Sequence, residues 1–569
     1  MIIHFTPMKR IRLVIAVIFV FCIKETNAQF SKYIIVLKDK NNTSFSLNNP
    51  SAYLSAKAIN RRNNQNIAID STDLPVNVVY LDSIRNAGAV TILNVSKWLN
   101  QVLIQTTDAA ALAKIMSLPF VRSSKGIAPR TTSRNSNDDK LIRKKSPSKK
   151  ANDIQGINDY FSYGSSYNQI NIHEGEFLHN KGFRGEGMTI AILDAGFYHY
   201  DVNPAFDSVR LNNQVLGTWD FVANKSSVTE EHSHGMFCFS TIAANRPGSM
   251  VGTSPKSKFY LFRTEDAATE FPVEEQNWVA AAERADSLGV DLITTSLGYT
   301  TFDDPSLDYT YEEMDGKTTI CGRGAEWATK KGMFVTAAAG NSGTSSWHYI
   351  STPADAEHVL AIGSVTYSGT PSDFSSYGPS SDGRVKPDVA SVGSNTVVAD
   401  FDGNPSGALS GTSLANPNLA GLITCLWQAF PEFTNMDIRD AVQRSGSKYN
   451  SPDNQMGYGI PNMRIAYNLL EAKRQEKNVD RILGQDWIKA YPVPFSTSFN
   501  VLVKSPNTGD VALILYTSGG ATVLTRNISI QANVSQSISF SNLNTLASGV
   551  YWLKYKDKTS TRVLRLIKQ

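Results

Sequence analysis

Short apolar strands alternate with amphipathic helices through the middle of the chain, from about residue 153 to residue 473. The predicted strands include 188–193, 258–262, 292–295, 333–338 and 359–363, and helices such as 277–288 and 325–331 lie between them. Continuous apolar strands joined by helical crossovers are typical of a parallel sheet that is covered on both faces. The pattern therefore predicts an α/β domain, with its functional residues at the carboxyl ends of the strands.

The segments on either side of this domain have different patterns. Residues 29–130 mix strand and helix signals that predict a small α+β unit. Residues 131–152 are rich in serine, asparagine and basic side chains and have too little apolar surface to fold, so they are predicted to be a linker. The polar residues 474–485 continue a helix into a second linker. Residues 486–569 show short alternating strands that predict a small all-β sandwich.

The first 28 residues have the pattern of a secretory signal peptide. A basic start that includes Arg10 and Arg12 is followed by the apolar run Leu13–Ile23, and Thr26–Ala28 is a plausible cleavage site. An uncleaved membrane anchor is the alternative. The apolar run is shorter than the roughly 20 residues that span a bilayer, so we expect cleavage and no stable transmembrane segment.

Charge and cysteine content exclude several other classes. The net charge of +4 is small for 569 residues and gives no reason to expect a nucleic-acid partner. Cleavage of the signal peptide leaves three cysteines, Cys238, Cys321 and Cys425, and none lies in a CxxC pair or at a metal-binding spacing. We therefore expect buried thiols, no disulfide scaffold and no metal ligands among the cysteines.

Four polar residues interrupt apolar runs of the central domain: Asp194, His234, Asn341 and Ser413. Asp194 follows a predicted strand, and His234 begins an apolar helix. Asn341 lies in a glycine-rich turn, and Ser413 precedes a run with helical spacing. Taken singly, each is more commonly a cap, a turn residue or a core residue.

Together these residue types suit nucleophilic catalysis. A serine hydroxyl needs a base such as histidine, and a buried carboxylate holds that histidine in the correct tautomer. An amide side chain can stabilise the oxyanion. The chain order Asp, His, Ser differs from the Ser, Asp, His order of α/β-hydrolases, which disfavours a lipase or an esterase.

Five segments resemble the subtilisin-like serine proteases (subtilases, peptidase family S8): 191–196, 234–244, 296–298, 340–341 and 411–417. The resemblance covers residues 153–473 and implies a subtilisin-like three-layer domain with a mostly parallel sheet. It implies a catalytic triad of Asp194, His234 and Ser413. It also implies that the Asn341 amide and the Ser413 backbone N–H stabilise the oxyanion.

The same resemblance implies two substrate-binding segments. One contains Ser296, Leu297 and Gly298 and is expected to pair with an extended protein or peptide substrate, and the other contains Ala338, Ala339 and Gly340. Together they are expected to wall the pocket for the side chain before the cleaved bond.

Two features depart from the family pattern. Cys238 lies one turn after His234, where it is either a thiol sensitive to mercurials or a packed core residue. An acidic insertion, 303–315, either holds a structural Ca²⁺ or is a solvated loop, and its spacing, which matches no calcium-binding loop, favours the loop. No cofactor is expected to be required.

The flanking units also resemble known domains. Residues 29–130 are similar to a subtilase propeptide, which implies a chaperone and inhibitor of the chain's own enzyme, and the basic linker 131–152 is the predicted region of maturation cleavage. Residues 486–569 resemble the sorting domain of the type IX secretion system, through the segments 490–495, 546–551 and 564–569. That likeness implies contact with the type IX machinery and export through the periplasm to the outside or the cell surface. A binding module for carbohydrate or protein is the alternative for this unit.

The whole chain is thus predicted to be a secreted serine endopeptidase that acts through an acyl-enzyme. An inactive subtilase fold used for surface binding or adhesion is the alternative, and the presence of all four catalytic residue types disfavours it.

Overall fold

The computed structural model describes residues 30–129, 142–143 and 158–569. The predicted signal peptide and most of the predicted linker 131–152 lie outside these residues. The chain forms two compact units, Met1–Ala466 and Tyr467–Gln569. Within the described ranges, no helix is both long and apolar enough to cross a membrane.

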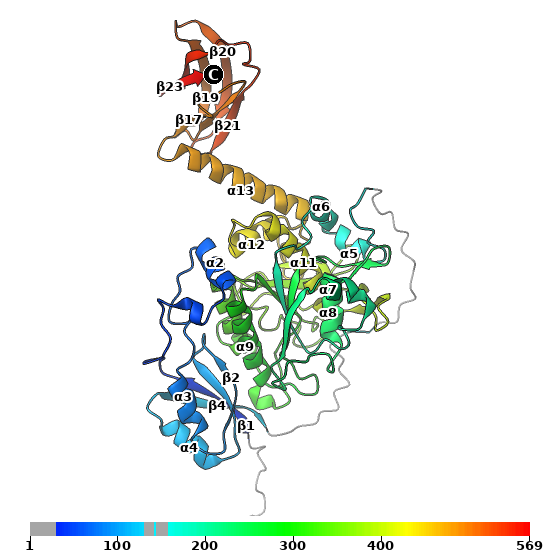
Figure 1. The fold of residues 1–569 in the computed structure, drawn as a ribbon. Helices are drawn as coiled ribbons and strands as arrows, with labels where there is room; N and C mark the ends of the chain where they lie inside the picture. The colour runs from blue at the N-terminus through cyan, green and yellow to red at the C-terminus, as the bar shows by residue number, and fades with distance from the viewer. Residues whose placement is uncertain (1–29, 130–141, 144–157) are drawn as a thin grey trace, which may run out of the picture. The chain divides into compact units, whose positions relative to one another are not determined.

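The first part of the larger unit is a four-stranded antiparallel sheet with the order β2-β3-β1-β4 (Figure 1). Its strands are β1 (Phe30–Leu37), β2 (Thr91–Ser96), β3 (Gln101–Gln105) and β4 (Val121–Pro129). Helices α3 (Val78–Arg85) and α4 (Ala109–Ser117) belong to the same α+β unit, and Asn77 and Asp108 cap their amino ends. A long connection between β1 and α3 contains a one-turn helix, η1 (Pro50–Ala52), and helix α2 (Ala56–Asn64).

The alternation of side chains along β1 explains how this sheet is buried on both faces. Ile35 belongs to one apolar cluster, which also contains Ile115 of α4. Ile34 points the other way and belongs to a cluster shared with Trp278 of helix α9 (Val273–Leu288). The small unit therefore packs against the central domain through apolar side chains.

The central domain is built on a seven-stranded sheet with the order β14-β13-β12-β11-β6-β10-β7, and all of its strand pairs are parallel. The strands are β6 (Thr189–Asp194), β7 (Val215–Asp220), β10 (Lys258–Arg263), β11 (Leu292–Thr295), β12 (Phe334–Ala338), β13 (Leu360–Val365) and β14 (Val389–Val392). This confirms the predicted parallel sheet. The two strands that the sequence pattern missed, β7 and β14, are its edges.

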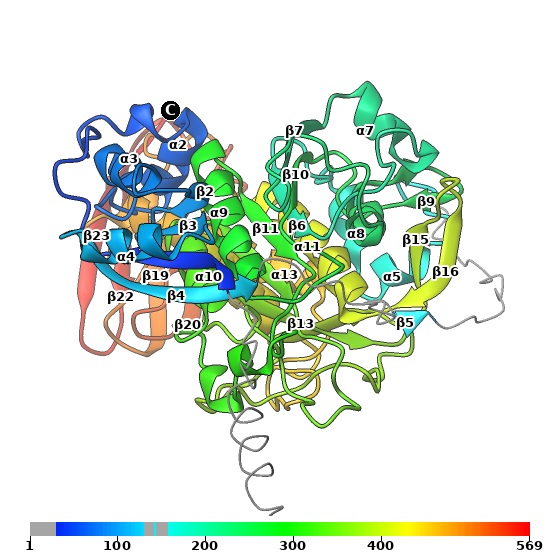
Figure 2. The same cartoon turned by 90° about the horizontal axis from the view of Figure 1, so that it is seen from below.

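Helices cover both faces of this sheet (Figure 2). Helices α8 (His234–Ala243) and α11 (Thr412–Ala429) pack together on one side, and α9 packs with α10 (Ile320–Lys330) on the other. The central domain also contains α5 (Tyr167–Asn171), α6 (Gly175–Asn180), α7 (Asp207–Leu211), α12 (Asn435–Arg444), the hairpin β8 (Asn245–Arg246) and β9 (Met250–Val251), and the short helices η2 (Pro204–Phe206), η3 (Pro305–Leu307) and η4 (Tyr311–Glu313). Helix α9 begins four residues before the predicted helix 277–288. Its first turn contains Glu274 and Glu275, where negative charge interacts favourably with the helix dipole.

A small antiparallel sheet lies beside the start of α11. Strand β15 (Thr396–Ala399) pairs with β16 (Pro405–Ser410), and β16 also pairs with β5 (Ile142–Arg143). In the second pairing Ile142 lies opposite Ser410. A piece of the predicted linker therefore runs as a strand along β16, which leads directly into α11.

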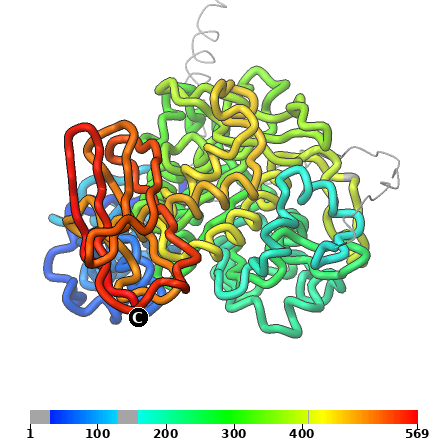
Figure 3. The backbone as a smooth tube through the Cα atoms, turned by 90° about the horizontal axis from the view of Figure 1, so that it is seen from above, coloured from blue at the N-terminus to red at the C-terminus, as the bar shows by residue number. Residues whose placement is uncertain are grey.

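The smaller unit begins within helix α13 (Met463–Leu483), which continues through most of the predicted linker 474–485. The rest of this unit is two antiparallel sheets, β17-β18-β21 and β20-β19-β22-β23, whose chain is drawn in orange and red in Figure 3. They pack around an apolar cluster that includes Phe499, Leu513 and Leu553. The strands are β17 (Ile488–Tyr491), β18 (Phe499–Val503), β19 (Gly509–Thr517), β20 (Thr522–Ile530), β21 (Gln536–Phe540), β22 (Gly549–Lys556) and β23 (Thr561–Lys568). The predicted all-β sandwich is confirmed.

Candidate active site

The four predicted catalytic residues lie at ends of secondary-structure elements of the central domain. Asp194 is the last residue of β6, and His234 is the first residue of α8. Asn341 comes three residues after β12 ends, and Ser413 is the second residue of α11. The strand ends share one edge of the sheet, because all of its strands are parallel.

Asp194 and His234 form a buried pair. The His234 Nδ1 atom lies 2.6 Å from the Asp194 Oδ1 atom, and the side chains are 1% and 0% exposed. The same carboxylate oxygen accepts the N–H of Ala195 at 2.7 Å. Burial alone would lower the pKa of His234, but the adjacent Asp194 carboxylate outweighs it and holds that pKa well above its usual value of 6.5.

Ser413 lies at the amino end of α11, where unpaired N–H groups and the helix dipole favour negative charge. Its hydroxyl donates to the backbone oxygen of Ser296 at 3.3 Å. The His234 Nε2 atom is buried and makes no hydrogen bond with any described residue. The base therefore has an open acceptor position in this structure.

Cys238 shows that the base and the serine are brought together. Its Sγ atom lies 3.9 Å from His234 Nδ1 and 3.2 Å from the backbone oxygen of Ser413, to which the thiol donates. The side chain is fully buried, and burial raises the pKa of the thiol. Cys238 of α8 is thus a packed, protonated thiol that contacts α11.

The Asn341 side chain is tied to the residue before the serine. Its Oδ1 atom accepts both the backbone N–H and the hydroxyl of Thr412, each at 2.9 Å. With the oxygen held in this way, the Nδ2 atom is the donor end of the amide. A Cβ atom at Gly411 would lie 3.5 Å from that nitrogen, so glycine leaves the space beside it open.

The two predicted substrate-binding segments lie at the carboxyl ends of neighbouring strands. Thr295 of β11 pairs with Ala337 of β12, so residues 296–298 and 338–340 lie side by side at the carboxyl edge. Ser296, Leu297, Ala338 and Ala339 are buried, Gly298 is exposed, and Gly340 is intermediate.

Two further residues shape this edge, and neither was expected from the sequence. Asn416 of α11 donates to the backbone oxygen of Thr295 at 2.8 Å and so fixes the helix against β11. Ser351 lies between the two segments: a Cβ atom would come within 2.0 Å of its Oγ at Gly298 and within 3.3 Å at Gly340. No hydrogen bond joins this buried Oγ atom to another described residue. The sequence around Ser351 resembles an ordinary turn and gives no signal of this position.

The acidic insertion 303–315 uses several of its carboxylates to cap backbone N–H groups. Asp304 accepts the N–H of Ser306 at 3.0 Å, and Glu313 accepts that of Thr310 at 2.8 Å. A separate group of carboxylates comes from Glu265, Glu270 and Glu274, whose oxygens lie within 4.8 Å of one another. Carboxylate oxygens are the donor atoms that Ca²⁺ prefers, and this group brings one oxygen of each residue to that spacing, where a full site has six to eight. That the insertion 303–315 is a solvated loop in place of a calcium site stays a prediction.

Comparison with known proteins gives matches to three domain families. Residues 185–459 match the subtilase family (peptidase S8). Residues 32–145 match the peptidase S8 propeptide domain of Bacteroidota, and residues 489–569 match the secretion system C-terminal sorting domain.

Individual relatives agree with the first of these matches. Subtilisin BL and subtilisin Savinase of Lederbergia lenta are each 29% identical over 290 residues, which are 51% of this chain and 93% of theirs. An alkaline protease of Shouchella clausii is 29% identical over the same share of this chain and 66% of its own. Among solved structures, the MycP3 protease from the type VII (ESX-3) secretion system is 20% identical with a TM-score of 0.44, covering 54% of this chain and 88% of that one.

Proposed function

Because the chain belongs to the subtilase family through residues 185–459, we propose that it is a serine endopeptidase with Ser413 as its nucleophile. The observation that carries the proposal is the buried pair of Asp194 and His234, with a nitrogen-to-oxygen distance of 2.6 Å and an open Nε2 atom on the histidine. The C-terminal sorting domain directs the chain through type IX secretion to the cell surface or the extracellular space.

The proposed reaction begins when His234 Nε2 takes the proton of the Ser413 hydroxyl, and the Oγ atom attacks the carbonyl carbon of a peptide bond. Asp194 holds the Nδ1–H and stabilises the imidazolium. The Asn341 Nδ2 group and the Ser413 backbone N–H donate to the oxyanion. When the tetrahedral intermediate collapses, His234 gives the proton to the leaving amine, and an ester of Ser413 remains.

Water completes the cycle. His234 takes a proton from a water molecule, whose oxygen attacks the ester carbonyl and forms a second tetrahedral intermediate. Collapse of that intermediate releases the carboxyl product, and His234 returns the proton to Ser413. The enzyme is regenerated, and one peptide bond has been exchanged for an amine and a carboxylic acid.

The pairing of β5 with β16 supports a peptide substrate. Ile142 lies opposite Ser410, three residues before Ser413, in an antiparallel ladder. This edge thus accepts an extended backbone, as β-augmentation by a substrate requires. Segments 296–298 and 338–340 are proposed to hold the part of the substrate that precedes the cleaved bond.

Replacement of the nucleophile tests the proposal. In Ser413→Ala we expect hydrolysis of casein to fall by about 10⁶-fold and labelling by a fluorophosphonate to disappear. Ser208→Ala, in the surface helix α7, is a matched control that should label and hydrolyse normally. If wild-type protein that has been freed of its propeptide neither labels nor hydrolyses, the alternative of an inactive binding or adhesion scaffold is correct.

A further inference from the structure

Helix α2 makes a second contact between the propeptide and the catalytic domain, separate from the apolar contact of the sheet with α9. It packs against the carboxyl end of α9, where Gly289 ends the helix at φ +83° and a Cβ atom would lie 2.6 Å from the Cβ of Lys57. The chain then enters β11 at its amino end. This contact is therefore at the edge of the sheet opposite the one that carries Asp194 and Ser413.

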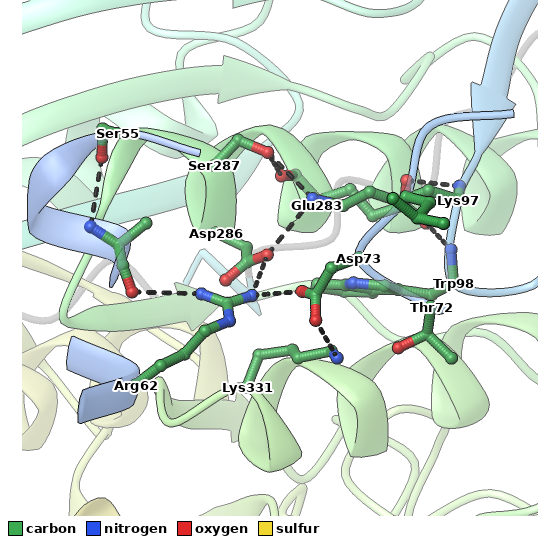
Figure 4. Close-up of polar contacts among 12 residues, drawn as sticks. Ser55, Arg62, Thr72, Asp73, Lys97, Trp98, Glu283, Asp286, Ser287 and Lys331 are labelled. Atoms are coloured by element: carbon green, nitrogen blue, oxygen red, sulfur yellow. Dashed lines mark hydrogen bonds and ion pairs between the residues drawn. The ribbon is translucent and has the colours of Figure 1, made fainter. Parts of the chain in front are cut away.

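A chain of buried charges crosses this contact (Figure 4). Arg62 of α2 is fully buried, and its Nη2 atom lies 2.6 Å from Asp73 and 2.8 Å from Asp286 of α9. The other oxygen of Asp73 accepts from Lys331, which follows α10, at 2.8 Å. These charges come from both domains: Arg62 and Asp73 belong to the propeptide, and Asp286 and Lys331 belong to the catalytic domain.

Neighbouring cations of the propeptide complete the set. Arg61 pairs with Asp286 and also donates to the backbone oxygen of Lys331 at 3.1 Å, at the carboxyl end of α10. Lys97 lies 3.3 Å from Asp286. Carbonyl groups at helix carboxyl ends lack partners within the helix and attract cations, so α2 supplies what both helix ends need.

Buried charge pairs discriminate between partners more than they add affinity. A well-packed apolar pair at the same place would be about as stable as the charge pair. Removal of one charge, however, leaves the other charge buried without a partner. A catalytic domain without a carboxylate at the place of Asp286 would leave Arg62 short of a partner. The same geometry therefore favours the native partner and penalises others.

We propose that Arg62, with Arg61, Asp73 and Lys97 and with Lys57 at its exposed border, is a recognition anchor. It holds the cut propeptide on its own catalytic domain through Asp286, Lys331 and Asp291. The anchor rests on the proposed function, in which this unit is the inhibitor of the enzyme. Because it lies at the opposite edge of the sheet, it keeps the propeptide attached even when the active site itself is vacated. A catalytic domain that lacks the matching charges is held less tightly.

The test uses the full chain in a Ser413→Ala background, with a recognition sequence for a site-specific protease placed within residues 131–152. After cutting, the dissociation rate of the propeptide is measured by size-exclusion chromatography over time. Arg62→Met should raise this rate by about 100-fold, because it breaks a buried pair and leaves Asp286 and Asp73 with fewer partners. Arg85→Met is the matched control, since Arg85 forms an exposed pair with Asp82 within α3, and it should leave the rate unchanged.

A double substitution separates recognition from general packing. Asp286→Leu combined with Arg62→Met removes both members of one pair, so its dissociation rate should be well below the product of the two single effects. Rates for Arg62→Met within twofold of the Arg85→Met control would overturn the anchor, as would single effects that simply add in the double variant.

Thermal melting of the uncut chain shows whether Arg62→Met folds. If it does not fold, Lys57→Met is the variant that tests the anchor. Lys57 is 41% exposed and pairs with Asp291 at 2.6 Å, so its loss should be tolerated and should speed dissociation by roughly two- to fivefold. An unchanged rate in that variant would count against the anchor. The readout is binding in a chain without its nucleophile, so failure of the proposed enzymatic function would leave this result standing, and the reverse also holds.

Discussion

Asp194 and Asp286 are two fully buried carboxylates of the same domain, and the difference between their surroundings separates structure from chemistry. Asp286 meets Arg61 with one oxygen and Arg62 and Lys97 with the other. Burial works to raise the pKa of Asp286, but Lys97, Arg61 and Arg62 outweigh it and lower that pKa to about 2.

Asp194 has a sparser environment. Its Oδ1 atom meets His234 and the N–H of Ala195, whereas its Oδ2 atom has no hydrogen-bond partner among the described residues. The imidazole is open at Nε2. These two unpartnered atoms, Asp194 Oδ2 and His234 Nε2, lie at the edge of the sheet that also carries Ser413. We call Asp286 and its cations the closed network, because both of its carboxylate oxygens are paired, and Asp194 with His234 the open network, because each keeps an atom without a partner in the described part of the chain. The closed network joins the propeptide to the catalytic domain, and the open one leaves an atom free to react.

The largest effect should come from the open network. Asp194→Asn keeps the shape of the side chain but favours the wrong tautomer of His234, so kcat/KM should fall by about 10⁴-fold. The measurement is hydrolysis of pooled fluorogenic peptides after an added protease has removed the propeptide. Asp286→Asn, assayed in the same way, should stay within about twofold of wild type because it contacts no catalytic group. Equal losses in the two variants would contradict the distinction between the two aspartates.

Asn341 should have the next largest effect. Asn341→Ala removes the proposed oxyanion donor and should lower kcat by about 10²- to 10³-fold with little change in KM. Because Asn341 also accepts from Thr412, Thr412→Val is the companion variant that loses one of those contacts and keeps the donor. A loss in Thr412→Val as large as that in Asn341→Ala would assign the effect to positioning of the helix instead of the oxyanion.

The pH dependence of activity should follow the Asp194–His234 pair. Only neutral His234 accepts a proton, and its pKa is raised, so the rising limb of kcat/KM should lie above pH 6.5. The raised pKa means that the native state binds the proton more tightly than the unfolded chain does. The pair therefore stabilises the fold below pH 6.5 and loses that contribution as the pH rises through the raised pKa. A limb at or below pH 6.5 would show that the carboxylate does not control the base.

The open network could be predicted from the sequence, and the closed one could not. Asp194 and Ser413 stand out because each interrupts an apolar pattern at the end of an element. The partners Arg62 and Asp286 are 224 positions apart, and each looks like an ordinary charge on the solvent face of a helix. Only the docking of α2 on α9 buries them.

The same limit explains the missed strands and the missed Ser351. Strand β7 is an edge strand with mostly half-buried residues, and β14 has only four residues, so neither shows a long apolar run. Ser351 lies close to Gly298 and Gly340 only because the fold brings these distant parts of the sequence together. Local pattern predicts which elements form, whereas contacts between distant elements decide what surrounds a side chain.

Cys238 gives the smallest expected effect and tests how far the open network extends. It touches both His234 and the backbone of Ser413, yet it is fully buried with a raised pKa, so it remains a neutral thiol. Cys238→Ala removes a small buried side chain and should lower kcat/KM by no more than about threefold and lower the melting temperature by a few degrees, as a small cavity does. Kinetics and thermal melting check the two effects separately. A large loss of activity without a change in melting temperature would make the thiol a positioning residue for His234 and would extend the reactive group beyond Asp194, His234, Asn341 and Ser413.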